Sequence, residues 1–125
     1  MESAAAIKSL AALAQATRLD AFRILVREGP EGLAAGVLAA RLGVQPATLS
    51  FHLAQLERAG LLVSQRRSRQ ILYAADFGAM RALLGFLLED CCHGRPEVCG
   101  DLLPEAMGRA QEVERGSGPD PASNG

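Results

Sequence analysis

Residues 45–73, QPATLSFHLAQLERAGLLVSQRRSRQILY, decide the fold because their hydrophobic period changes once, at Gly60. Before that glycine, apolar residues recur at intervals of four and three residues, which is the spacing of a helix that buries one face. These residues are Leu49, Leu53 and Leu56. Gln45 and Pro46 suit the beginning of such a helix, and a glycine suits its end. The pattern therefore predicts a helix that runs to Arg58.

The residues after Gly60 predict a β-hairpin. Leu62–Arg66 and Gln70–Ala74 are typical of two strands, and the polar residues 67–69 are typical of the turn that joins them. A helix followed directly by a basic hairpin is thus the central unit of the chain.

The residues before this unit predict three further helices. The first begins near Ser3 and carries an apolar stripe. Its members are Ile7, Leu10 and Ala14. Thr17 offers an N-cap for the second helix, Arg18–Arg27, which ends at a Gly-Pro pair. Leu33–Leu42 predicts a short third helix closed by Gly43, so the third and fourth helices form a helix, a tight turn and a helix.

A last helix is predicted from Asp76, a suitable N-cap, with apolar residues at steps of three and four along one face. They are Phe77, Met80, Leu84, Leu87 and Cys91. The expected fold is therefore mainly α with a small β-hairpin, in the order ααααββα. We expect one domain over 1–100 and a weakly ordered to disordered tail over 101–125, whose Gly, Pro and Ser content cannot support a core.

Charge and hydropathy exclude some classes of protein. The net charge is −1, but residues 97–125 hold six acids and two arginines, a net −4, so residues 1–96 carry +3. No apolar run approaches the ~20 residues of a membrane span. The sequence predicts a cytoplasmic protein without a membrane association. The sequence contains no Cys-x-x-Cys pair, nucleotide-binding loop or acid/base pair that would indicate an enzyme.

Polar residues at the start of the fourth helix are suited to contact DNA bases in the major groove. The candidates are Gln45, Thr48 and Ser50. His52 could contact phosphate or could stabilise the packing between this helix and the hairpin, and we favour a structural or backbone role. Phe51 is expected to be a packing residue rather than a base-stacking one.

The hairpin tip carries three arginines, Arg66, Arg67 and Arg69, which could neutralise phosphates or enter the minor groove. A charged hairpin tip can also be no more than a solvated edge. The preceding helix-turn-helix favours contact with double-stranded DNA.

Three cysteines, Cys91, Cys92 and Cys99, lie within nine residues and nowhere else. An odd number without a signal peptide argues against a disulfide framework. Such clustering favours soft-ion ligation or redox sensing.

The segments PATLSFHLAQLERAGLL, RRSRQILYAADF and FLLEDCCHG resemble the ArsR family of winged-helix, metalloid-responsive repressors over about residues 5–100. The resemblance implies a winged helix-turn-helix fold. It also implies a homodimer through the first and last helices and a pseudo-palindromic DNA operator. Two inducer sites of that family are missing. Residues 41–50 lack a Cys-x-Cys pair, and Asp76 has no partnering His pair.

The three cysteines resemble those of the arsenic-responsive subgroup, which carries a vicinal Cys pair at the end of the last helix and a third Cys several residues on. The resemblance implies As(III) or Sb(III), or a methylarsenite, as the inducer, held by three thiolates. Residues 93–98 supply the Gly and Pro that would let the segment turn back. Zinc with His93 as a fourth ligand, another soft metal, or persulfide and oxidant sensing are the alternatives. A further alternative is that the cysteines sense nothing and that Cys91 is only a small apolar residue of the core.

Overall fold

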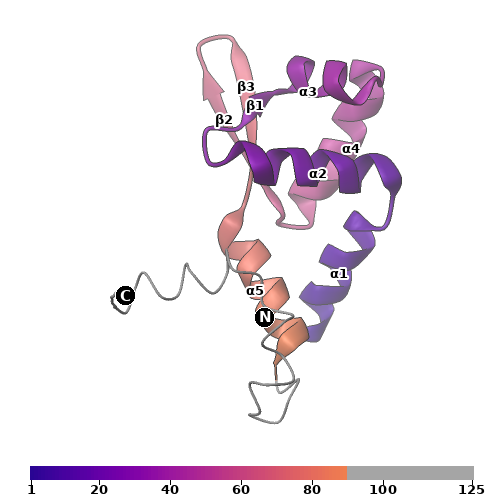
Figure 1. Cartoon of the computed structure of the whole chain (residues 1–125), viewed down its shortest axis with the longest axis vertical. Helices are drawn as coiled ribbons and strands as arrows, with labels where there is room; N and C mark the ends of the chain where they lie inside the picture. The colour runs from indigo at the N-terminus through magenta and orange to yellow at the C-terminus, as the bar shows by residue number, and fades with distance from the viewer. Residues whose placement is uncertain (90–125) are drawn as a thin grey trace. The chain divides into compact units, whose positions relative to one another are not determined.

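The computed structural model describes residues 1–89 of the 125, and residues Met1–Leu87 form one unit by their contacts. Five helices and three strands are found in the described residues, in the order ααβααββα. They are α1 (Ser3–Leu13), α2 (Ala16–Glu28), β1 (Leu33–Ala34), α3 (Ala35–Leu42), α4 (Pro46–Arg58), β2 (Leu62–Arg67), β3 (Gln70–Ala75) and α5 (Phe77–Leu88). The predicted class, mainly α with a small β-hairpin, is confirmed (Figure 1).

The core is built where α2, α3 and α4 meet the base of the hairpin. Three leucines of α4, Leu49, Leu53 and Leu56, are completely buried, as their spacing predicted. Leu25 of α2 and Leu38 of α3 are buried as deeply and belong to the same cluster. Because each helix contributes one apolar face, α4 is held with its opposite face exposed.

The sheet has three antiparallel strands in the order β1-β3-β2. The hairpin register pairs Arg67 with Gln70, so Ser68 and Arg69 form a two-residue turn, and Ser68 has a left-handed φ of 56°. The short β1 pairs with β3 across residues Tyr73 and Leu72. The hairpin is therefore attached through β3 to the segment between α2 and α3.

Two helix starts differ from the sequence-based prediction. The residues Leu33–Ala34 are strand β1 and not the first turn of the third helix, because they pair with β3. The N-cap of α2 is Gln15 and not Thr17, since its side chain accepts a hydrogen bond of 2.8 Å from the backbone N–H of Arg18. For α5 the predicted N-cap is confirmed, because Asp76 Oδ1 accepts from the backbone N–H of Ala79 at 3.0 Å.

The apolar stripe predicted along α5 is only partly buried. Phe77 and Met80 pack against the core, but the buried residue of the next turn is Leu83, and Leu87 is exposed. Cys91, the predicted end of the stripe, lies outside the described residues, as do the boundary at residue 100 and the tail. None of the helices in residues 1–89 is long and apolar enough to cross a bilayer.

Candidate nucleic-acid interface

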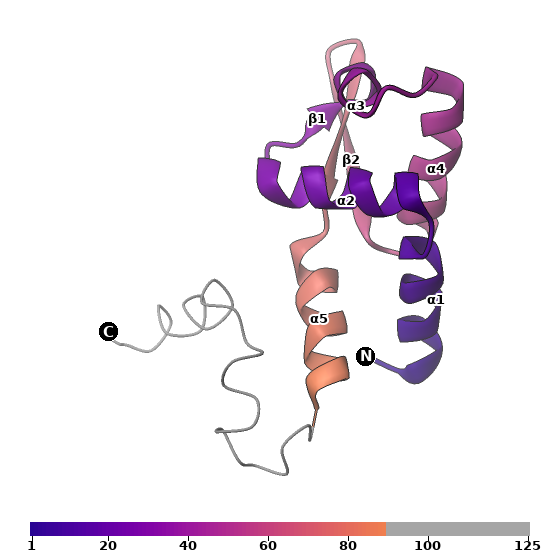
Figure 2. The ribbon, with the colours of Figure 1, turned by 45° about the vertical axis from the view of Figure 1, so that its right-hand side comes forward.

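The start of α4 and the tip of the β2–β3 hairpin lie at the same end of this unit, away from the first residues of α1 (Figures 1 and 2). The arrangement follows from the buried face of α4 and from the pairing of the middle of β3 with β1. The elements predicted to contact DNA are therefore presented together.

The N-terminal turns of α4 expose three predicted site residues, Gln45, Thr48 and Ser50. On a helix that advances 100° per residue, Thr48 and Ser50 lie on opposite flanks of the exposed face, with Phe51 between them. The side chain of Phe51 is 58% exposed, so the prediction that it packs in the core is wrong within residues 1–89. The sequence spacing could have predicted this exposure. Residue 51 is two residues from both Leu49 and Leu53, so on a helix it must point away from them.

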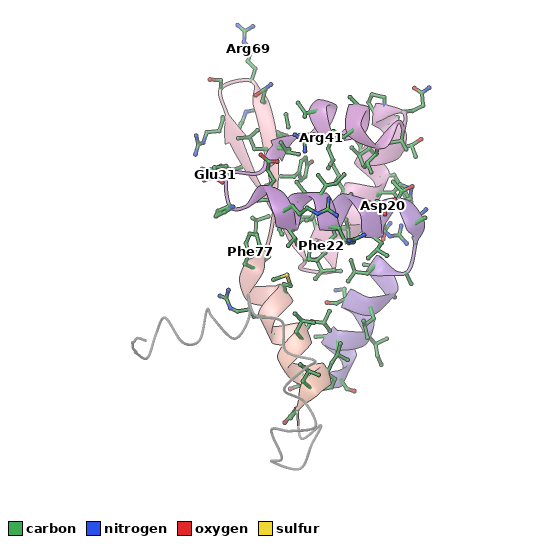
Figure 3. The ribbon with its side chains drawn as sticks, viewed as in Figure 1. Asp20, Phe22, Glu31, Arg41, Arg69 and Phe77 are labelled. Atoms are coloured by element: carbon green, nitrogen blue, oxygen red, sulfur yellow. The ribbon has the colours of Figure 1, made fainter. Side chains whose placement is uncertain are left out.

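A groove of about 810 Å³ lies between α3, α4 and the hairpin. It is lined by two predicted residues, Ser50 of α4 and Arg69 of the turn, and by Arg41 of α3, which the sequence reasoning missed. Figure 3 shows Arg69 projecting from the tip of the hairpin and Arg41 lying between the hairpin and the helices. The side chain of Arg41 is half exposed and lies 3.6 Å from the carboxylate of Glu28.

An exposed ion pair of this kind contributes little to stability, so the Arg41 guanidinium can exchange the Glu28 carboxylate for another anion at small cost. Only the folding of α3 against the hairpin places Arg41 beside the groove. The local sequence shows only a basic residue in the last turn of a helix. Such a residue interacts favourably with the helix dipole in any protein, so it does not by itself indicate a binding role.

The three arginines of the hairpin do not form a single patch. Successive residues of a strand point to opposite faces, so Arg66 and Arg67 are directed to different sides of the hairpin. Arg66 pairs with Ile71 and Arg67 pairs with Gln70, and both of these partners line the groove. All three arginines are exposed.

His52 contacts Arg18 of α2. Its Nδ1 lies 3.2 Å from Nη1 of Arg18, whose Nε–H donates to the backbone oxygen of Ala12 at 2.6 Å. Because a guanidinium can only donate, Nδ1 must be unprotonated. Arg18 therefore joins the end of α1 to the recognition helix α4, and the structural role favoured for His52 acquires a specific partner.

This contact makes stability depend on pH. Desolvation by burial, and then the positive charge of Arg18, lower the pKa of His52 below its ordinary 6.5. The unfolded chain binds the proton more readily than the folded one, so His52 stabilises the fold fully above pH 6.5 and loses that contribution as pH falls through the lowered pKa. We expect an NMR titration of the His52 ring to give a pKa below 6.5, and to give a higher value in Arg18→Gln.

The control for this titration is Arg41→Gln, which removes an arginine that has no contact with His52 and should leave its pKa unchanged. An identical pKa in the wild type and in Arg18→Gln would contradict the contact.

The hairpin and α4 are also tied by a hydrogen bond of 2.9 Å from the hydroxyl of Ser64 to the carboxylate of Glu57. Among residues 1–89, no three His, Cys, Asp or Glu side chains lie close enough to hold a metal ion. The predicted metal ligands Cys91, Cys92 and Cys99 fall outside the described residues.

A family model described as a helix-turn-helix domain matches residues 13–65, which run from the end of α1 into β2. Two similar solved structures are HlyU from Vibrio cholerae N16961 and NolR from Sinorhizobium fredii. HlyU is 33% identical, over 70% of this chain and 97% of its own, with a TM-score of 0.56. NolR is 31% identical, over 70% of this chain and 84% of its own, with a TM-score of 0.57.

A third structure is similar in fold. Mb0332 from Mycobacterium bovis is 22% identical, over 73% of this chain and 84% of its own, with a TM-score of 0.55. It is described as the homodimeric winged helix-turn-helix DNA-binding domain of a possible ArsR-family transcriptional regulator. No curated protein matches the sequence.

Proposed function

Because this chain belongs to the winged-helix transcriptional regulators of the ArsR/HlyU type, we propose that it represses transcription by binding operator DNA and that trivalent arsenic or antimony releases it. Membership of that family makes it a DNA-binding regulator and not an enzyme. Repression, dimerisation and the nature of the inducer are proposals, and they rest on the resemblance to the ArsR family together with the residues described below.

The groove beside α4 is the observation that supports DNA contact by the predicted residues. It brings Ser50, Arg69 and Arg41 together at the end where the recognition helix begins. Serine hydroxyls and arginines are common partners of phosphate oxygens, and the exposed start of a recognition helix enters the major groove. In this proposal one DNA strand passes along the groove while Gln45 and Thr48 approach base edges.

Exposed apolar side chains on α1 and α5 support a homodimer. Ile7 is 64% exposed and Leu87 is 49% exposed, and Leu10 is exposed as well. Leaving large apolar side chains in water is unfavourable by roughly 25 cal/mol for each Å² that could be buried. We therefore propose that a second copy of the chain covers these residues, which would present two recognition helices to a two-fold symmetric operator.

The proposed inducer rests on the spacing of the three cysteines. Cys91 follows Leu88, the last residue of α5, by three residues, and Cys92 and Cys99 complete a group of three thiols. Soft trivalent metalloids bind thiolates. In the proposed mechanism the thiolates of Cys91, Cys92 and Cys99 would hold the ion, and this ligation would draw residues 92–99 toward the end of the dimerisation helix and would change the arrangement of the two recognition helices. A coupling free energy of ~1–3 kcal/mol lowers DNA affinity by roughly 5- to 150-fold.

Fluorescence anisotropy tests the proposal on a labelled duplex selected by the protein from a random-sequence library. We expect arsenite to weaken binding by roughly 5- to 150-fold in the wild type. In Cys99→Ser, a lost response to arsenite and antimonite with an unchanged response to methylarsenite would support a site in which the inorganic ions need all three thiolates and a methylated arsenical needs two. The matched control is Ser3→Ala, which changes an exposed serine at the start of α1 and leaves all three thiols.

DNA affinity unaffected by any of the three ligands would contradict the choice of inducer. Release by Zn²⁺ or by a persulfide donor would instead support the alternative sensors.

A further inference from the structure

Phe51 is an exposed aromatic residue in the middle of the recognition helix. The chain has four phenylalanines, and the other three, Phe22, Phe77 and Phe86, are buried or half-buried. Phe51 alone among them is more than half exposed, at 58%. An aromatic ring that contributes little to the core requires another explanation.

The helix geometry places this ring at the centre of the exposed face of α4. At 100° per residue, the three buried leucines of α4 share one side, and Phe51 lies almost opposite them together with Ala47 and Arg58. Ala47 and Arg58 are exposed too. The predicted contacts Thr48 and Ser50 lie on its two flanks. Any surface that receives both of them must also receive the ring.

The ring is held by contacts that lead back into the fold. Its centroid is 5.5 Å from that of His52 at an interplanar angle of 67°, an edge-to-face arrangement of the kind that aromatic pairs prefer. His52 is in turn held by Arg18 at 3.2 Å. Because the ring rests on a fixed neighbour, less side-chain freedom remains to be lost when it binds.

The partner that this position selects is apolar. A phenyl ring forms no hydrogen bond to a base edge or to a phosphate. The apolar group that DNA displays in the major groove is the C5-methyl group of thymine. We propose that Phe51 contacts a thymine methyl group in each half of the operator and that it contributes to sequence specificity. This inference rests on the binding of DNA by α4, but not on the identity of the inducer.

Replacement of thymine by deoxyuridine tests the contact, because it removes the methyl group and leaves every hydrogen bond unchanged. Each thymine of the library-selected duplex is replaced in turn, and anisotropy gives the dissociation constant for the wild type and for Phe51→Ala. We expect one symmetry-related pair of positions at which demethylation weakens wild-type binding about four-fold per half-site, the value for one buried methyl group. Phe51→Ala should bind the unmodified duplex roughly ten-fold more weakly and should show no further loss on demethylation.

Phe51→Leu is the conservative variant, since it keeps an apolar side chain, and it should retain part of the sensitivity to demethylation. Leu19→Ala changes an exposed apolar residue of α2 and should respond to deoxyuridine as the wild type does. Equal sensitivity to demethylation in Phe51→Ala and the wild type would overturn the inference while leaving DNA binding intact. A Phe51→Ala protein that loses its dimeric state in sedimentation would overturn it too, by assigning the ring to a protein interface. Failure of the wild type to select any duplex would refute DNA binding itself.

Discussion

Replacing Arg66, Arg67 and Arg69 together by alanine should weaken DNA binding about 100-fold or more at ~0.1 M salt, because the change removes up to six arginines that would contact phosphates in the proposed dimer. The three side chains are exposed and occupy the tip and both sides of the hairpin. Removing one arginine that neutralises a phosphate makes the slope of log Kobs against log salt concentration shallower by ~0.9. Measuring the dissociation constant of the selected duplex over a series of salt concentrations gives both quantities.

The control for the wing variant is the triple replacement of Arg23, Arg27 and Arg81 by alanine, which removes the same charge from exposed positions on α2 and α5. Only the wing variant should show the shallower slope. Equal slopes in the two triple variants would mean that the wing is a solvated edge and contributes no more than its share of the net charge.

Gly32→Ala should lower the free energy of unfolding by about 3 kcal/mol or more, through strain in two forms. Gly32 has a φ of +73°, and a Cβ atom there would lie 2.9 Å from the carbonyl carbon of Tyr73 in β3 and closer still to its oxygen. A side chain could rotate away from such an overlap, but the paired strand backbone cannot move without breaking its hydrogen bonds. Urea denaturation at one fixed protein concentration measures the change.

Gly43 and Gly60 provide matched controls for Gly32. Their φ values are +68° and +86°, but a Cβ atom at either position would have no neighbour within 4 Å. Alanine at these positions should therefore cost only the conformational term, about 1 kcal/mol. A Gly32→Ala protein as stable as Gly43→Ala would show that the loop before β1 adjusts freely and that the close approach to β3 is not a constraint on the hairpin.

The limits of α4 and of the hairpin were predictable because the signals that set them are local. The helix begins at Pro46 and ends at Arg58 as its leucine spacing and flanking residues indicated, and the strands extend the predicted ones by one residue each. Local preference failed at residues 33–34. Leu33 and Ala34 fit a helix by composition, but they pair with Tyr73 and Leu72, almost forty residues away, and pairing of that range leaves no periodic signal in a two-residue strand.

The candidate DNA-contacting surface was predicted only in part. The exposed polar residues Gln45, Thr48 and Ser50 were identified from their spacing on one helix. Arg41 was missed because its position beside Ser50 and Arg69 depends on how α3 packs against the hairpin. The contact of His52 with Arg18 was not predicted, because it joins residues 34 apart in the sequence.

Residues 45–73 by themselves determined that a helix with one buried face precedes a basic hairpin. The hydrophobic period and the effects of proline and glycine are local, because each depends on only a few neighbouring residues. Tertiary structure decided which faces of those elements remain free. Burial of Leu49, Leu53 and Leu56 against α2 and α3 turns Phe51 outward, and pairing of β3 with β1 sets Arg69 across a groove from Ser50. Contacts between distant segments fix such orientations, and those contacts exist only once the core has formed.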